Sequence, residues 1–215
     1  MSNDIKSGKY LIIGAGIIGL SIAKALKEKQ PDADIIILEK ENEVGAHASG
    51  RNSGVLHAGF YYTANSFKAR FAREGNRRLT EYCHENNLKI NNAGKVVVAQ
   101  NEQELETLHE LYRRGQKNGV DVSLISEKEM KELEPAAETC QEALYSPTTS
   151  TVDPKEVVTH LAGKLKEQGV KFLLGQGYKR NLQDNKIETT KGEQIQAEKI
   201  INAAGLYADK VARDF

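Results

Sequence analysis

Three glycines near the start of the chain have the spacing of a motif that binds the pyrophosphate of a dinucleotide. Gly14, Gly16 and Gly19 form a GxGxxG sequence. In this motif the first glycine permits a tight turn, the second lets the backbone approach the pyrophosphate, and the third lets a helix pack on a strand. Glu39 follows about 20 residues later, where a carboxylate accepts hydrogen bonds from ribose hydroxyls and repels a 2′-phosphate. The pattern predicts a site for NAD or FAD and disfavours NADP. The alternative is a glycine turn with an exposed glutamate.

The elements that must position these residues form one βαβ unit. Residues 10–13 are an apolar run typical of a buried parallel strand, and the glycine turn follows it directly. A helix is predicted from this turn to about Lys29, before Pro31. A second apolar run, residues 34–38, ends at Glu39. Strand, turn, helix and strand together predict the βαβ unit.

A long irregular loop and a helix are predicted next. Residues 45–59 are rich in Gly, Ser, Asn and His, and a loop of this length is usually functional. Ser66 is a suitable N-cap for a helix that reaches about Asn86. The expected buried stripe of this helix consists of Phe67, Phe71, Leu79, Tyr82 and Cys83.

The remaining sequence predicts two further groups of elements. Strands are expected over 95–99, 122–125 and 143–145. A helix begins at Asn101 and ends at 118–119, and a second helix opens on a capping box of Ser126 and Glu129. Asp153 and Pro154 then begin a helix that runs to Gln168. Strands over 170–174, 187–190 and 199–202 precede Ala204 and Gly205.

Composition excludes several classes of protein. The 215 residues predict one domain or two small ones, and 30 basic side chains balance 30 acidic ones. No net charge therefore recruits nucleic acid. Cys83 and Cys140 lie far apart, without a CxxC motif or a histidine pair at metal spacing. We expect two reduced thiols, no metal site and a cytoplasmic protein.

The loop after Glu39 carries a resemblance to a known family. Residues 49–62, SGRNSGVLHAGFYY, resemble the FAD-dependent L-2-hydroxyglutarate oxidases and dehydrogenases of the D-amino-acid-oxidase-like superfamily. The resemblance continues through 66–71, 81–83, 94–99 and 202–209, and so covers nearly the whole chain. It implies an α/β fold with a discontinuous, Rossmann-like FAD-binding domain over 1–88 and 150–215. Part of an antiparallel α+β substrate domain would occupy 89–149.

The resemblance also implies which residues bind FAD. The pyrophosphate would be held at the glycine turn, the ribose by Glu39 with Lys40 beside it, and adenine by the backbone near Tyr178. The flavin end would be lined by loop residues Ser49, Asn52, Ser53, Gly54 and Val55. After the last strand, Ala204 and Gly205 would return the chain to the pyrophosphate. The full set is Gly14, Gly16, Ile17, Ile18, Gly19, Glu39, Lys40, Ser49, Asn52, Ser53, Gly54, Val55, Tyr178, Ala204 and Gly205.

Candidate groups for the substrate lie near the same loop. His57 is the best candidate for a base that takes the hydroxyl proton, because its pKa range suits that task; a loop histidine bonded to the backbone is the alternative. Tyr62 is expected to bind a carboxylate, although Tyr61 and Tyr62 suit packing equally well. Strand alternation sends Lys95 opposite to Val96, which would point it into a substrate pocket. His47 is expected to be structural or at the surface.

The implied reaction is oxidation of a small 2-hydroxy acid, with L-2-hydroxyglutarate first. A hydride would pass to the flavin, and the electrons would pass to O₂ or a membrane quinone, the latter requiring a peripheral membrane contact. One alternative is an amine or amino-acid oxidase of the same superfamily. The other is a truncated, non-catalytic FAD-binding fragment, because family members are longer than 215 residues.

Overall fold

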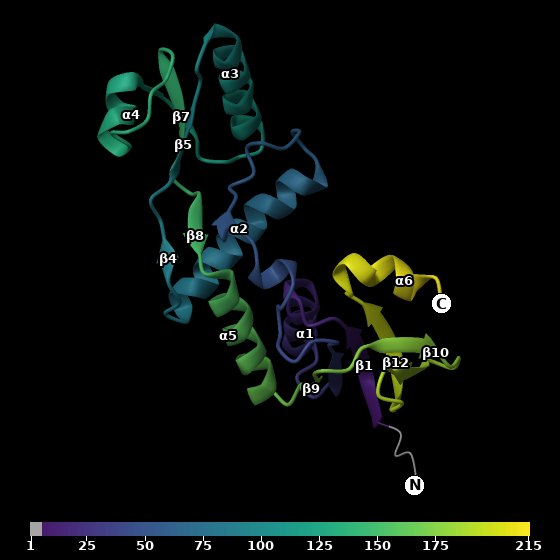
Figure 1. Ribbon diagram of the computed structural model, residues 1–215. Helices are drawn as coiled ribbons and strands as arrows, with labels where there is room; N and C mark the ends of the chain where they lie inside the picture. Colours follow the sequence, from purple (N-terminus) through teal and green to yellow (C-terminus); the bar gives the residue numbers. More distant parts are fainter. Residues whose placement is uncertain (1–5) are drawn as a thin grey trace. The chain divides into compact units, whose positions relative to one another are not determined.

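The computed structural model describes residues 6–215 and gathers them into two compact units (Figure 1). The first unit contains residues up to Asn52 together with Pro154–Phe215. The second unit is the continuous segment Ser53–Asp153. The functional boundaries expected above, at 88 and 150, stay a prediction, since compactness alone does not test them.

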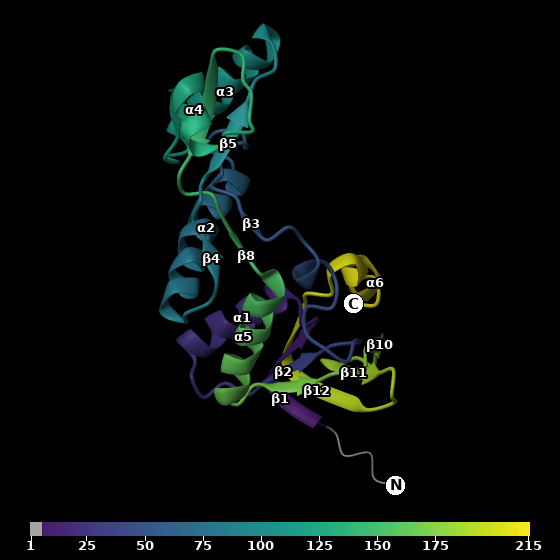
Figure 2. The same cartoon turned by 60° about the vertical axis from the view of Figure 1, so that its left-hand side comes forward.

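The first unit is built on a six-stranded sheet with the order β10-β11-β12-β1-β2-β9 (Figure 2). Its parallel strands are β1 (Lys6–Ile13), β2 (Ile35–Leu38), β9 (Lys171–Leu173) and β12 (Gln194–Asn202). Strands β10 (Tyr178–Asn181) and β11 (Lys186–Thr189) extend one side in antiparallel fashion. The predicted βαβ unit is thus present, with α1 (Ile17–Lys29) between β1 and β2.

Both faces of this sheet are covered, which explains why its central strands are continuous apolar runs. Leu11 and Ile13 of β1 belong to one core cluster, together with Val211 of α6 (Ala208–Ala212). Ile12 is also fully buried, and strand alternation directs it to the opposite face. Helices α1 and α5 (Pro154–Glu167) pack against each other. Two short 3₁₀ turns, η1 (Ala48–Gly50) and η2 (Gly205–Tyr207), complete the unit.

The second unit contains two small antiparallel sheets and three helices. One sheet has the order β3 (Val55–Leu56), β8 (Ser150–Val152) and β4 (Ile90–Asn91). The other has the order β5 (Lys95–Val98), β7 (Glu142–Ser146) and β6 (Ser123–Ser126). The helices are α2 (Phe67–Glu85), α3 (Glu102–Lys117) and α4 (Glu127–Leu133). Phe60, Leu108 and Leu144 form the centre of the core.

The predicted helix starts in this unit carry the expected caps. The Ser66 hydroxyl accepts a hydrogen bond from the Ala69 amide at 3.2 Å, and Asn101 caps α3 in the same way. Ser126 and Glu129 form the full capping box of α4. The sequence did not indicate β4 and β8, because strands of two and three residues are too short for a period to be visible.

The buried stripe predicted for α2 is wrong at two positions. Phe67 and Phe71 are 74% and 64% exposed, and their rings stack on each other at 5.9 Å. The buried residues of this helix are Ala69 and Cys83. Ala69 contacts Gly59 closely, since a Cβ on that glycine would lie 3.2 Å from the Ala69 carbonyl oxygen. Residues two positions away on a helix lie on the opposite side, so both phenylalanines turn outward.

This correction predicts that two phenylalanines contribute very differently to the free energy of unfolding. Phe60→Ala removes a side chain that is 1% exposed and should lower the free energy of unfolding by about 3–5 kcal/mol. Phe71→Ala removes an exposed ring and should lower it by less than about 1 kcal/mol. Urea unfolding of both variants, followed by circular dichroism, measures the difference. Equal losses for the two variants would contradict the assignment.

Candidate functional site

A cavity of about 820 Å³ lies in the first unit at the carboxyl ends of its parallel strands. Ile13 and Gly14 line it at the end of β1, Leu38 and Glu39 at the end of β2, and Ala203 after β12. Ligands of open α/β sheets bind at this edge, in the crevice beyond the strand ends. The cavity is therefore the candidate binding site of this unit.

The glycine turn has a geometry that only glycine can adopt at two of its positions. Gly14 has a φ of +111°, and a Cβ there would lie 2.3 Å from the Ala203 carbonyl oxygen. A Cβ on Gly19 would lie 2.0 Å from the Gly14 carbonyl oxygen. Backbone hydrogen bonds from Gly14 to Leu38 and from Ala203 to Ile13 hold the three strand ends together. These contacts give the first and third glycines the roles predicted for them.

The first turn of α1 lies at this cavity, which Gly16 and Ile18 line. Gly16 is the N-cap and has no side chain to bond the helix. The Ser49 hydroxyl accepts from the Ile17 amide at 2.9 Å, and a Cβ on Gly16 would lie 3.0 Å from that hydroxyl. The N-terminus of a helix and its dipole favour a phosphate at such a place. The arrangement therefore fits a pyrophosphate between the turn and Ser49.

The Glu39 carboxylate is held in a fixed orientation at the end of β2. One oxygen accepts from the Ala15 amide at 2.8 Å, and the other accepts from the Glu41 amide at 3.0 Å. Each carboxylate oxygen has further acceptor capacity. A half-buried, oriented acceptor next to a pyrophosphate site fits the ribose hydroxyls of an adenosine group.

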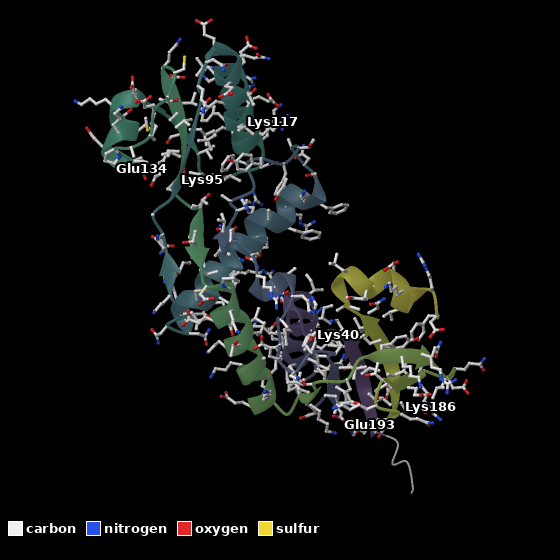
Figure 3. All side chains as sticks on the ribbon, viewed as in Figure 1. Lys40, Lys95, Lys117, Glu134, Lys186 and Glu193 are labelled. Atoms are coloured by element: carbon white, nitrogen blue, oxygen red, sulfur yellow. The ribbon has the colours of Figure 1, made fainter. Side chains whose placement is uncertain are left out.

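Cations surround the mouth of this cavity. The Glu41 carboxylate bonds Lys40 and His47, and these bonds hold its pKa at about 2, well below its usual range. The Lys40 ammonium lies 5.2 Å from the centre of the Tyr207 ring, and the Lys210 ammonium lies 5.1 Å from it (Figure 3 labels Lys40). Positive charge beside an aromatic face suits a ligand that carries phosphates and a planar base.

The structure brings nine of the fifteen predicted cofactor residues to this cavity. They are Gly14, Gly16, Ile18, Glu39, Lys40, Ser49, Tyr178, Ala204 and Gly205. Ile17 and Gly19 do not line the cavity; the Ile17 amide donates to Ser49, and Gly19 lies against the Gly14 carbonyl. Asn52 does not line the cavity, and Ser53, Gly54 and Val55 belong to the second unit.

Sequence reasoning missed several lining residues that follow Gly205. Leu206, Tyr207, Lys210 and Arg213 all line the cavity. Leu206 is 90% exposed, which is unusual for a leucine. Tyr207, Lys210 and Arg213 recur every three residues after the last strand, and this spacing was the available signal.

The second unit holds a separate cluster around the predicted base. The rings of His57 and Tyr61 meet edge to face, with centroids 6.5 Å apart. The Lys95 ammonium lies 4.8 Å from the centre of the Tyr61 ring (Figure 3 labels Lys95). Tyr62 contacts Lys68 instead, at 4.6 Å. Tyr61 is therefore the tyrosine that accompanies the two predicted functional residues.

The environment of His57 favours its neutral form. Partial desolvation of the ring, and secondly the positive charge of Lys95, lower the pKa of His57 below its ordinary value. At neutral pH the imidazole is therefore unprotonated and has a nitrogen free to accept a proton. This is the state that a general base needs before reaction.

Comparison with known families identifies the chain. Residues 9–215 match the model of the family described as FAD dependent oxidoreductase. The chain belongs to this family. FAD is thus the cofactor, as predicted, and the glycine turn, helix terminus and Glu39 fit its pyrophosphate and ribose. Within residues 6–215, no group of three or more His, Cys, Asp or Glu side chains is arranged to hold a metal ion.

Several curated relatives of this oxidoreductase share a name. L-2-hydroxyglutarate dehydrogenase of Escherichia coli strain UMN026 is 35% identical over 207 residues, which are 95% of this chain and 49% of that protein. The protein of that name from Indibacter alkaliphilus is 38% identical, over 95% of this chain and 52% of its own length. The human mitochondrial protein of that name is 34% identical, over 98% of this chain and 49% of its own length. The predicted resemblance is confirmed, and the chain spans about half the length of these relatives.

Solved structures of the same fold confirm the predicted α/β class. Glycine oxidase from Geobacillus kaustophilus matches with a TM-score of 0.87 at 22% identity, over 97% of this chain and 58% of that one. FAD-bound L-alpha-glycerophosphate oxidase from Mycoplasma pneumoniae matches with a TM-score of 0.86 at 24% identity, over 98% of this chain and 57% of that one. Among the described residues, no helix is both long and apolar enough to cross a membrane.

The glycine turn generates a first prediction for this site. Gly14→Ala should abolish retention of FAD, since its Cβ overlaps the Ala203 carbonyl oxygen and alanine disfavours a φ of +111°. Gly163→Ala, in helix α5 with open space around it, is the matched control and should retain FAD. Visible absorbance after desalting measures the bound flavin. Equal flavin in both variants would contradict the role of Gly14.

The second prediction concerns the charge next to His57. Lys95→Gln removes the positive charge and should raise the pKa of His57 toward the ordinary value of about 6.5. Lys68→Gln removes the positive charge beside the Tyr62 ring instead, and it should leave the pKa of His57 unchanged. The imidazole proton resonances, followed against pH by NMR, report both values. A pKa of His57 that is insensitive to Lys95→Gln would contradict the proximity of the two side chains.

Proposed function

We propose that the protein takes part in the FAD-dependent oxidation of a small 2-hydroxy acid, with L-2-hydroxyglutarate as the first candidate. The observation that carries the proposal is the cluster of His57, Tyr61 and Lys95, a neutral base beside a cation. The shared name of relatives that are 34–38% identical supports the choice of substrate. Because the chain spans about half of those relatives, turnover is proposed for the whole protein.

The residues of the second unit would act on the substrate in two ways. The neutral imidazole of His57 would accept the proton of the substrate hydroxyl. The Lys95 ammonium would bind a carboxylate of the substrate by a charge-assisted hydrogen bond, and the phenol of Tyr61 would donate a further one. We also keep Tyr62 as a proposed hydrogen-bond donor to a substrate carboxylate. When bound, FAD supplies the acceptor for the hydride that leaves the substrate carbon.

The residues of the first unit would hold the cofactor. The pyrophosphate would lie against Gly14, Gly16 and Ser49, with Glu39 on the ribose. Asn52, Ser53, Gly54 and Val55 would line the flavin end, as the resemblance implies. We further propose O₂ or a quinone as electron acceptor and a cytoplasmic location, with contact to a membrane surface if the acceptor is a quinone.

The test compares substrates and one pair of variants under anaerobic conditions. L-2-hydroxyglutarate should bleach the flavin absorbance of the FAD-loaded protein, whereas amino acids should not. His57→Asn should slow this bleaching about 10²–10⁴-fold without loss of flavin, because the proton acceptor is missing. His84→Asn, at the exposed end of α2, is the matched control and should bleach normally.

Two outcomes would overturn the proposal. Bleaching by amino acids or amines, and not by the hydroxy acid, would favour an amine or amino-acid oxidase of the same family. The second outcome compares this 215-residue chain with a full-length relative that carries the same residues. If the substrate bleaches the flavin bound to the relative but not the flavin bound to this chain, the chain is a non-catalytic FAD-binding fragment.

A further inference from the structure

A buried amide lies next to the loop that carries Tyr61 of the His57 cluster. Asn118 is the C-cap of α3 and is only 9% exposed. Its side-chain nitrogen donates to the Gly59 carbonyl at 3.3 Å and to the Tyr62 carbonyl at 3.0 Å. Its side-chain oxygen accepts from the Asn65 amide at 3.3 Å. Both donors and the acceptor of this one amide therefore serve a single loop, residues 59–65.

Asn118 is itself anchored from two helices. Its own amide donates to the Arg114 carbonyl of α3 at 2.8 Å. Its carbonyl accepts from the Arg73 guanidinium of α2, also at 2.8 Å. The following Gly119 has a φ of +64°, and a Cβ there would lie 2.6 Å from the Arg73 nitrogen. The Asn-Gly pair thus forms a rigid support for whatever the Asn118 side chain holds.

The loop needs such a support because its own bonds are few and long. Within it, the Tyr62 amide donates to the Gly59 carbonyl at 3.4 Å. Phe60 is buried in the core, and the Tyr61 ring lies against it with the ring centroids 4.2 Å apart. The carbonyls of Gly59 and Tyr62 flank this pair of residues. Those flanking carbonyls, of Gly59 and Tyr62, are the two that Asn118 binds. The bonds of Asn118 therefore hold the backbone on both sides of Tyr61, while Phe60 supports its ring.

We infer that Asn118 is a positioning residue that holds the 59–65 loop so that Tyr61 stays beside His57 and Lys95. Its three side-chain hydrogen bonds go to backbone atoms of the loop, and it acts through that backbone. Its importance for turnover rests on the proposed function, whereas its effect on the cluster does not. The signal in the sequence was an Asn-Gly helix end, which by itself indicates only a C-cap.

A second helix in the same unit provides a matched control. Asn86 is the C-cap of α2, and its side-chain nitrogen donates at 2.8 Å to the Tyr82 carbonyl of its own helix. Asn86→Ala therefore removes a C-cap amide without touching the loop. Asn118→Ala removes all three bonds to the loop. Asn118→Asp keeps the shape and the acceptor but places a carboxylate against the Gly59 and Tyr62 carbonyls.

The experiment follows the titration of His57 by NMR in the full chain, with the His57 resonance assigned by its loss in His57→Asn. If Asn118 positions the loop, both Asn118 variants should raise the pKa of His57 toward about 6.5, because the ring becomes more solvated and less close to Lys95. Asn86→Ala should leave the titration as in the wild type. A shift in Asn118→Ala as well as in Asn118→Asp excludes a direct effect of the new carboxylate.

Three results would overturn the inference. Folded Asn118 variants with a wild-type titration would show that the loop holds itself. An equal shift in Asn86→Ala would show a general loosening of the unit. Loss of folding in both Asn118 variants would make the residue a support of the whole unit rather than of the loop. Normal bleaching by His57→Asn together with a shifted titration would reject the proposed base and leave the positioning role intact.

Discussion

The close approach of two backbone segments at Gly14 is the constraint on which the cofactor site depends. The turn after β1 passes so near the end of β12 that a Cβ on Gly14 would lie 2.3 Å from the Ala203 carbonyl oxygen. Because of this approach, the end of β12 lies beside the end of β1, where the first turn of α1 begins. Glu39, Ser49 and Gly205 reach the cavity only because these chain segments meet there. The site is therefore a consequence of parallel strand packing as much as of particular side chains.

Polar groups in both units are oriented by backbone amides or carbonyls rather than by ion pairs alone. The Glu39 carboxylate is held by two amides, and the Ser49 hydroxyl is held by a third. In the second unit, the Asn118 amide holds two carbonyls of the loop beside His57. Hydrogen bonds to the backbone are short-range and directional, so they define orientation more narrowly than exposed charges, whose interactions water screens.

Much of the fold and part of the candidate site could be predicted from the sequence. The βαβ unit and the helix caps at Ser66, Asn101 and Ser126 followed from motifs in which a local conformation requires a particular residue type. FAD as cofactor followed from the resemblance of the sequence to a family. The buried stripe of α2 could not be predicted at Phe67 and Phe71. Their apolar spacing fits a core face, but the close contact of Ala69 with the Gly59 backbone decides which side turns inward.

By itself, the sequence determined the glycine turn, the carboxylate after the second strand and the family, because each depends on consecutive or regularly spaced residues. Only the tertiary structure decided that Tyr61, not Tyr62, accompanies His57 and Lys95, and that Lys40 and Lys210 flank Tyr207. These residues come from different elements and have no fixed spacing. Tyr61 is placed by packing around Phe60, and Asn118 bonds the backbone on both sides of it. Such long-range contacts leave no local pattern in the chain.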